Sequence, residues 1–216
     1  SGLNEIDNGI DCYKTIIGYD PDNHLANRSL ARIYHSQQNY ELAQQYFSAA
    51  IRIQPEDHDS MFALVQIFND LKVYQKAIEY SNKLLQIKPD HLDGLMEQAY
   101  AYAMLGEVDK AFECYNKILQ FDPGNYKAYR RIGVLLSHSG QYAQADASFE
   151  KAIQVNPDDF ETFYEWGISA NAEKKYPKAI KCFEKSVEIN PQFAKAYAYL
   201  AKYYYEVKDF EKTIGL

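Results

Sequence analysis

The chain has 216 residues, a hydrophobic content of 47% and a formal net charge of −7 at pH 7. A chain this long and this apolar can bury a core, which excludes wholesale disorder, and its acidic balance argues against nucleic acid as the main partner because phosphate binding needs a basic surface. No apolar run approaches the roughly 18 to 20 residues that span a bilayer, so membrane insertion is not expected either.

The clearest pattern in the chain is a period of 34 residues. Six of the seven prolines follow it: Pro21, Pro55, Pro89, Pro123, Pro157 and Pro191. Each of them has an apolar residue two positions earlier, a small residue twelve positions earlier and, in most cases, a tyrosine fifteen positions earlier. A fixed period of this length indicates a repeat architecture.

In chain order, residues 1–23 are predicted to form the second helix of an earlier repeat. Complete repeats follow at 24–57, 58–91, 92–125, 126–159 and 160–193. The partial repeat at 194–216 contains one further first helix and, at 209–216, a fragment of its partner. All of these belong to one domain. Because the sequence begins and ends inside a repeat, we expect it to be a fragment of a longer protein.

Residues 126–159 show how each repeat is built. The first helix has an apolar stripe at the spacing of one buried helical face: Tyr129, Ile132, Gly133 and Leu136. Gly140 is suited to end this helix, and a second helix follows with Ala145 and Phe149 on its inner face. The small residues Gly133 and Ala145 let the two backbones approach closely. Pro157 then prevents the second helix from continuing.

This 34-residue helix–turn–helix unit, with its small, aromatic and proline columns, resembles the tetratricopeptide repeat (TPR) over essentially the whole chain. The resemblance implies an all-α fold, a right-handed superhelical solenoid of antiparallel helix pairs. It also implies that the first helices line a concave groove. The departures are few: Trp166 lies three residues after the usual tryptophan position, Ser81 replaces an aromatic residue and Thr213 replaces an alanine.

Catalysis needs polar groups that converge on one place, and the sequence shows no such constellation. The five histidines are spread mostly one to a repeat, without the close pairs that metal ions require. The chain also lacks a glycine-rich phosphate loop and a nucleophile elbow. We therefore expect no enzymatic activity, no cofactor and no metal site.

The three cysteines occupy the same position of different second helices, two or three repeats apart. Since packed helices lie about 8–10 Å apart, Cys12, Cys114 and Cys182 are too distant from one another for a disulfide, which needs Cα atoms within about 7 Å. This favours a reducing compartment such as the cytoplasm. Asn27 matches a glycosylation sequon, but it falls on the buried stripe of a helix and is discounted.

The stripe opposite the buried face of the first helices is the candidate binding face. By the same resemblance, this stripe lines the groove and commonly holds an extended peptide. Aromatic residues, methionine and arginine are enriched at binding hot spots, and all three types occur here. The candidate residues are Arg28, Arg32, Phe62, Gln66, Asn69, Met96, Tyr100, Lys127, Arg130, Arg131, Tyr164, Ile168, Asn171, Lys202 and Tyr205.

Part of this stripe is similar to the carboxylate clamp that some family members use to hold the acidic C-terminal tails of heat-shock chaperones. Lys127 and Arg131 match one pair of that clamp in type and spacing. Phe62 and Gln66 stand where the clamp has lysine and asparagine, and Glu97, where it has asparagine, would repel a carboxylate. We therefore expect a local basic patch and not a complete clamp.

The sequence predicts a protein–protein interaction scaffold that binds a peptide or protein segment, with acidic positions, in its groove. Groove aromatics would supply affinity, and the basic patches would orient the partner. Two alternatives stay open at this point. The chain could be a self-assembly module that forms homo-oligomers, or the regulatory arm of an enzyme whose catalytic domain lies elsewhere.

Overall fold

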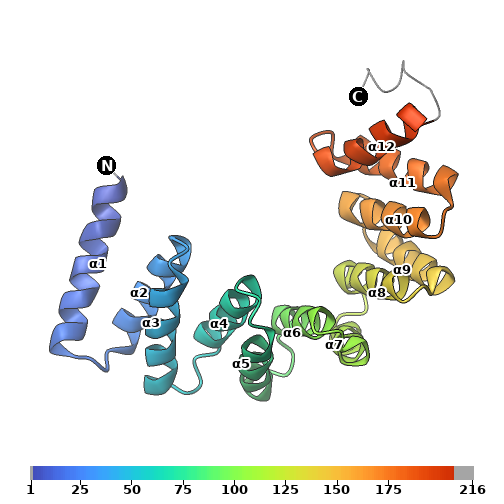
Figure 1. Ribbon diagram of the computed structural model, residues 1–216. Coiled ribbons are helices and arrows are strands. Elements are labelled where there is room, and N and C mark those ends of the chain that lie inside the picture. Colours follow the sequence, from blue (N-terminus) through green and yellow to red (C-terminus); the bar gives the residue numbers. More distant parts are fainter. Residues whose placement is uncertain (1, 207–216) are drawn as a thin grey trace. The chain divides into compact units, whose positions relative to one another are not determined.

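The computed structural model describes residues 2–206, and this range contains twelve α-helices and no strand (Figure 1). The predicted all-α class of helix pairs is therefore confirmed. The predicted helix fragment at 209–216, which includes Thr213, lies outside the described residues.

The helices alternate between first and second members of a pair. The first helices are α2 (His24–Ser36), α4 (His58–Asp70), α6 (Leu92–Met104), α8 (Tyr126–His138), α10 (Phe160–Ala172) and α12 (Ala194–Glu206). The second helices are α1 (Gly2–Tyr19), α3 (Tyr40–Ile53), α5 (Tyr74–Ile87), α7 (Val108–Phe121), α9 (Tyr142–Val155) and α11 (Tyr176–Ile189). From α2 onward, successive first helices begin 34 residues apart, and so do the second helices from α3 onward.

The start of each first helix from α2 to α10, apart from α6, is capped by an asparagine or aspartate. Asp57 Oδ1 accepts a hydrogen bond from the backbone N–H of Ser60 at 3.0 Å, and Asn125 does the same for Ala128 at 3.1 Å. At α6 the ring of His91 takes this role. A capping side chain satisfies one of the N–H groups that a helix start leaves without a partner, so these residues fix where the helices begin.

The turn inside each pair contains one residue in the left-handed backbone region. These residues recur every 34 positions: Gln38, Lys72, Gly106, Gly140 and Lys174. Gly140 has a φ of 74°, as expected for a glycine that ends a helix. The turn keeps this geometry even where the sequence supplies a glutamine or a lysine.

Small residues allow the two helices of a pair to cross closely. A Cβ atom added to Gly133 would lie 2.8 Å from Cε1 of Phe149, and one added to Gly167 would lie 2.7 Å from Cε1 of Phe183. Both phenylalanines are fully buried. Each glycine of a first helix therefore makes room for an aromatic ring of the second helix.

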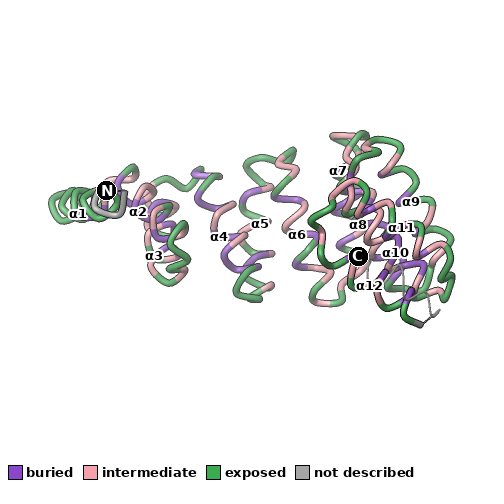
Figure 2. The backbone as a smooth tube through the Cα atoms, turned by 90° about the horizontal axis from the view of Figure 1, so that it is seen from above, coloured by how far each residue is buried: buried purple, intermediate pink, exposed green. Residues whose placement is uncertain are grey.

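The chain divides into two compact units, one up to Cys114 and one from Tyr115 onward, so the division falls inside α7. The first unit has a core that includes Leu30, Phe47 and Leu64. The core of the second unit includes Phe183 and Leu200. Within each unit, buried and exposed segments alternate along the helices (Figure 2), as expected where each helix turns one face to its neighbours.

The structure shows the surroundings of Asn27 and of the three cysteines. Asn27 is buried, and its amide donates hydrogen bonds to the carbonyl oxygens of Pro21 and Asn23. The three cysteines are free thiols, of which Cys12 is exposed. Burial raises the pKa of Cys182 to about 11, so this thiol is protonated and unreactive at neutral pH.

Candidate functional site

The two arginines at the fifth position of a first helix are both held by carboxylates of their own unit. Arg130, on α8, is 7% exposed, and its Nη1 lies 2.6 Å from Asp159 Oδ2 and 2.7 Å from Glu161 Oε2. Arg28, on α2, occupies the equivalent position three repeats earlier and pairs in the same way with Asp59. The predicted binding residue Arg130 therefore has an intramolecular role, and its contact with a partner stays a prediction.

A second carboxylate of the first unit, that of Asp57, lies beside Arg28. Asp57 is buried, and its carboxylate accepts hydrogen bonds from the side chain and backbone of Ser60 and lies 2.7 Å from His24 Nε2. Burial alone would raise its pKa, but these hydrogen bonds and the charge of Arg28 outweigh burial and lower the pKa below its usual value. Asp57 is thus a fixed negative charge at neutral pH.

In two other repeats, 58–91 and 160–193, the same position carries an aromatic residue, and its contact is aromatic as well. Phe62 lies against His91 with ring centroids 4.9 Å apart, and Tyr164 lies against Phe193 at 5.0 Å. In all four cases the fifth residue of a first helix contacts the last residue of its own 34-residue repeat. The chemistry of the two positions changes together, from an ion pair to a ring contact.

The two asparagines in the predicted binding set are engaged inside the protein. Asn69 is 5% exposed, and its amide nitrogen donates to the backbone oxygen of Glu97 at 3.0 Å and to the Glu97 carboxylate at 2.7 Å. The amide oxygen of Asn171 accepts a hydrogen bond from the Tyr203 hydroxyl. Both asparagines tie one first helix to the next, and sequence spacing alone could not reveal these partners.

Two further candidates of the second unit also contribute to packing. Tyr164 is half-buried among the rings of Phe183, Phe193 and Tyr199, and burial raises the pKa of its hydroxyl. Ile168 packs against the core of this unit. Their exposed edges are small, so these residues can offer a partner only part of their surface.

The remaining candidates reach solvent. The exposed ones are Arg32, Tyr100, Lys127, Arg131, Lys202 and Tyr205, and the half-buried ones are Arg28, Phe62, Gln66 and Met96. Tyr205 is the most open aromatic residue among them, at 64% exposed. The face that a partner could touch is therefore richer in basic residues than the full set of candidates suggests.

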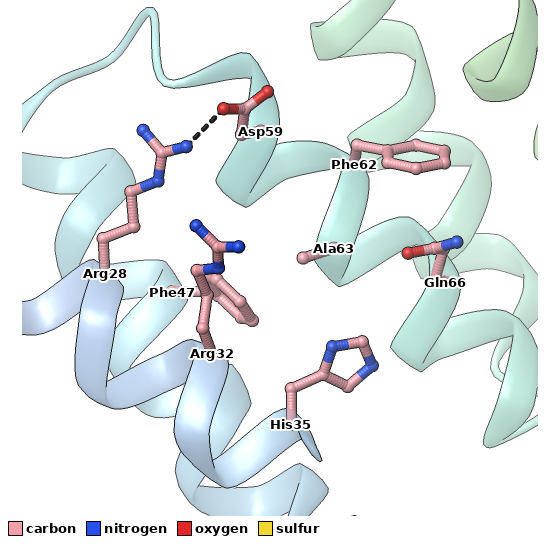
Figure 3. Close-up of a pocket in the computed structure, with 8 residues that line it drawn as sticks. All are labelled: Arg28, Arg32, His35, Phe47, Asp59, Phe62, Ala63 and Gln66. Atoms are coloured by element: carbon pink, nitrogen blue, oxygen red, sulfur yellow. Dashed lines mark hydrogen bonds and ion pairs between the residues drawn. The ribbon is translucent and has the colours of Figure 1, made fainter. Parts of the chain in front are cut away.

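A hollow of about 310 Å³ lies between α2 and α4 of the first unit (Figure 3). It is lined by Arg28, Arg32, His35, Phe47, Asp59, Phe62, Ala63 and Gln66. Four of these, Arg28, Arg32, Phe62 and Gln66, are among the predicted binding residues. The structure thus brings together candidates from two successive first helices in one concave place.

A smaller hollow of about 100 Å³ lies in the second unit. It is lined by Arg130, Arg131, Glu161, Tyr164, Glu165, Phe193 and Lys195. Burial raises the pKa of Glu165, while the charges of Arg131, Arg130 and His138 act in the opposite direction. Glu165 and Phe193 are absent from the predicted set, because Glu165 lies off the selected stripe and Phe193 lies in a loop. The paired change of the fifth and last positions of a repeat was the signal that could have found Phe193.

The described residues give no sign of a metal centre or a membrane helix. No three histidine, cysteine, aspartate or glutamate side chains among residues 2–206 are grouped so as to hold a metal ion. No helix within the described range is long and apolar enough to cross a bilayer.

Repeated helical hairpins with capped first helices, glycine–phenylalanine crossings and contacts between successive first helices define an α-helical repeat protein. Models of the tetratricopeptide repeat match residues 2–58, 37–91, 93–125, 126–159 and 167–193. The chain belongs to the tetratricopeptide repeat family. Repeats of this family build scaffolds for protein–protein interaction.

Solved structures of TPR proteins share the fold. PilW, a type IV pilus biogenesis factor, is 20% identical with a TM-score of 0.75, and the match covers 89% of each chain. TTC0263, a thermophilic TPR protein from Thermus thermophilus, is 18% identical with a TM-score of 0.69, covering 83% of this chain and 97% of its own. YrrB, described as a TPR protein with an unusual peptide-binding site, is 16% identical with a TM-score of 0.63, covering 85% and 95%. No curated protein sequence matches the chain.

Proposed function

We propose that the chain is a scaffold that binds a protein segment along the exposed face of its first helices. The observation that carries this proposal is the hollow between α2 and α4, where basic, polar and aromatic side chains converge (Figure 3). Pockets that combine an apolar wall with a few polar groups are the usual places where proteins hold a ligand. The peptide-binding site named for YrrB supports the same kind of use in a protein of this fold.

The basic residues of this face suit a partner with acidic positions. Arg32, Lys127 and Arg131 are exposed, and no ion pair joins any of them to another residue within 2–206. Unpaired arginine and lysine attract carboxylates over several ångströms and orient them at contact. The protein as a whole is acidic, so these positions also stand out against the rest of the chain.

A charge-reversal experiment tests the proposal on the whole chain. Peptides are first selected from a random displayed library with the wild-type protein, and their affinities are then measured for two triple variants. The groove variant carries Arg32→Glu, Lys127→Glu and Arg131→Glu. We expect it to bind the selected peptides at least about tenfold more weakly, because three favourable charges become repulsive.

The matched control reverses three exposed charges on second helices: Arg52→Glu, Lys117→Glu and Lys181→Glu. It has the same net charge as the groove variant, so a general electrostatic effect would appear in both. Equal affinities for the two triple variants, with unchanged circular dichroism, would show that the selected peptides do not use the first-helix face.

A further inference from the structure

We propose that the hollow between α2 and α4 receives one acidic side chain of the partner segment and that Arg32 pairs with its carboxylate. This inference rests on the proposed function and makes it specific, because it assigns one residue type of the partner to one site. It concerns an acidic side chain within the segment, as opposed to a terminal carboxylate or a phosphate group.

Arg32 is the available cation in this hollow. Its guanidinium extends into the space between the two helices, whereas Arg28 is turned toward Asp59 and paired with it (Figure 3). A second carboxylate, that of Asp57, also lies near Arg28, with Oδ1 3.9 Å from Nη1. Within residues 2–206, no hydrogen bond or ion pair engages the Arg32 side chain. An incoming carboxylate therefore meets Arg32 without having to displace an internal partner.

The side chains around Arg32 complement a carboxylate attached to a peptide. His35 of α2 and Gln66 of α4 also line the space, and the amide oxygen of Gln66 is turned toward Arg32 (Figure 3). Rotation of this amide about its last side-chain bond would present its nitrogen as a donor to a second carboxylate oxygen. Phe62 supplies an apolar wall next to Gln66. This combination suits an acidic residue that is followed or preceded by an apolar one.

The size and charge of the hollow favour a single acidic residue. Its volume of about 310 Å³ is at the lower limit of ordinary small-ligand sites. Of the described residues that line it, Asp59 alone carries a carboxylate, and Arg28 neutralises it. The hollow of the second unit has about a third of this volume, and Arg130, Arg131 and Lys195 share it with two carboxylates, Glu161 and Glu165. The two hollows therefore differ in size and in the number of carboxylates that an incoming acidic residue would meet.

The probe is a matched pair of short peptides, acetylated and amidated at their ends, with the sequence Gly-Ser-Phe-Glu-Ser-Gly or the same sequence with Gln in place of Glu. Each is titrated into the full chain labelled with ¹⁵N, and the side-chain Nε–H resonance of Arg32 is followed. That resonance is assigned by its loss in Arg32→Lys. We expect a saturable shift with the Glu peptide and an affinity about fivefold lower for the Gln peptide, the effect of one exposed ion pair.

Two variants separate the site from general electrostatics. Arg32→Gln should weaken the Glu peptide about fivefold and leave the Gln peptide unchanged. Arg52→Gln removes an exposed arginine of α3 outside the hollow and should change neither affinity. Two further peptides, with a phosphoserine or a free C-terminal carboxylate as the only anion, report whether another anion is preferred.

The outcomes are distinct. Equal affinities for the Glu and Gln peptides, or tighter binding of the phosphoserine or free-carboxylate peptide at Arg32, would overturn the inference. Saturable shifts on other first helices without one at Arg32 would overturn this site and leave the proposed function standing. If the groove variant and its control bind the selected library peptides with equal affinity, the proposed function itself is removed, whatever the short peptides do.

Discussion

At the scale of single residues, the fifth position of a first helix supplies one of the contacts that join successive first helices. Arg130 is enclosed by the carboxylates of Asp159 and Glu161, and Asp159 also accepts hydrogen bonds from Thr162. Removing one member of such a buried pair leaves the other charge without compensation, which costs far more than the pair itself contributes. Arg131 is next in sequence but exposed, so the two neighbours should respond very differently to substitution.

We predict that Arg130→Ala lowers the free energy of unfolding by about 2–4 kcal/mol, because the carboxylate of Asp159 becomes buried and unpaired. Arg131→Ala should change it by no more than about 0.5 kcal/mol, as expected for an exposed side chain. Urea denaturation followed by circular dichroism measures both. Similar stabilities for the two variants would show that the ion pairs of Arg130 contribute little to the fold.

At the scale of helices, residue sizes on the two members of a pair compensate each other. Gly133 faces Phe149 and Gly167 faces Phe183, with no room for an added methyl group. The second repeat reverses this arrangement, since Val65 occupies the glycine position and Ser81 the phenylalanine position. Ser81, which departs from the family pattern, is therefore matched by a larger residue on its partner helix.

We predict that Gly167→Ala destabilises the protein by about 1–3 kcal/mol, because the new Cβ would lie 2.7 Å from the ring of Phe183 and the buried ring cannot move away freely. Gly9→Ala is the matched control. Gly9 lies inside α1 with no atom within 4 Å of an added Cβ, so alanine should stabilise that helix by up to about 1 kcal/mol. Thermal melts should show a lower melting temperature for Gly167→Ala and a higher one for Gly9→Ala. Changes of the same sign in the two variants would contradict the steric argument.

The sequence predicts the helices far better than it predicts the partners of their side chains. Helix limits follow from local signals such as the capping residue Asp57, the left-handed turn residue Gly140 and the loop prolines, all of which act within a few residues. The periodicity also places Arg32 and Arg130 on one stripe. It cannot show that Arg130 is neutralised by carboxylates about thirty residues away while Arg32 is not, because that depends on three-dimensional packing between repeats.

At the scale of the whole molecule, the chain consists of two compact units that divide inside α7. In a repeat array each repeat contacts its neighbours, so stability is a sum of local terms and a defect acts mainly where it lies. The units have separate buried cores, one around Phe47 and Leu64 and one around Phe183 and Leu200. A perturbation of one unit should therefore be felt weakly in the other.

Hydrogen exchange can test this locality. We predict that Gly167→Ala speeds amide exchange in α10 and α11 by about tenfold, which corresponds to about 1.4 kcal/mol of local stability. Exchange in α2 to α5 should change by less than about twofold, because these helices belong to the other unit. Peptide-resolved mass spectrometry gives both values from one sample. An equal acceleration in both units would mean that the chain unfolds as a single cooperative body.

The contact between the fifth and last residues of a repeat has a consequence for how such a protein can grow. Arg28 and Asp57 lie within one 34-residue segment that begins at a first helix, and so do Arg130 and Asp159. Duplicating or grafting a segment cut just before a first helix carries both members along. A segment cut before a second helix, such as 40–73, takes Asp57 without Arg28 and leaves a buried charge unmatched at the seam. The side chains thus mark the cut points at which this array can gain or lose a module with the buried pair of fifth and last residues kept together.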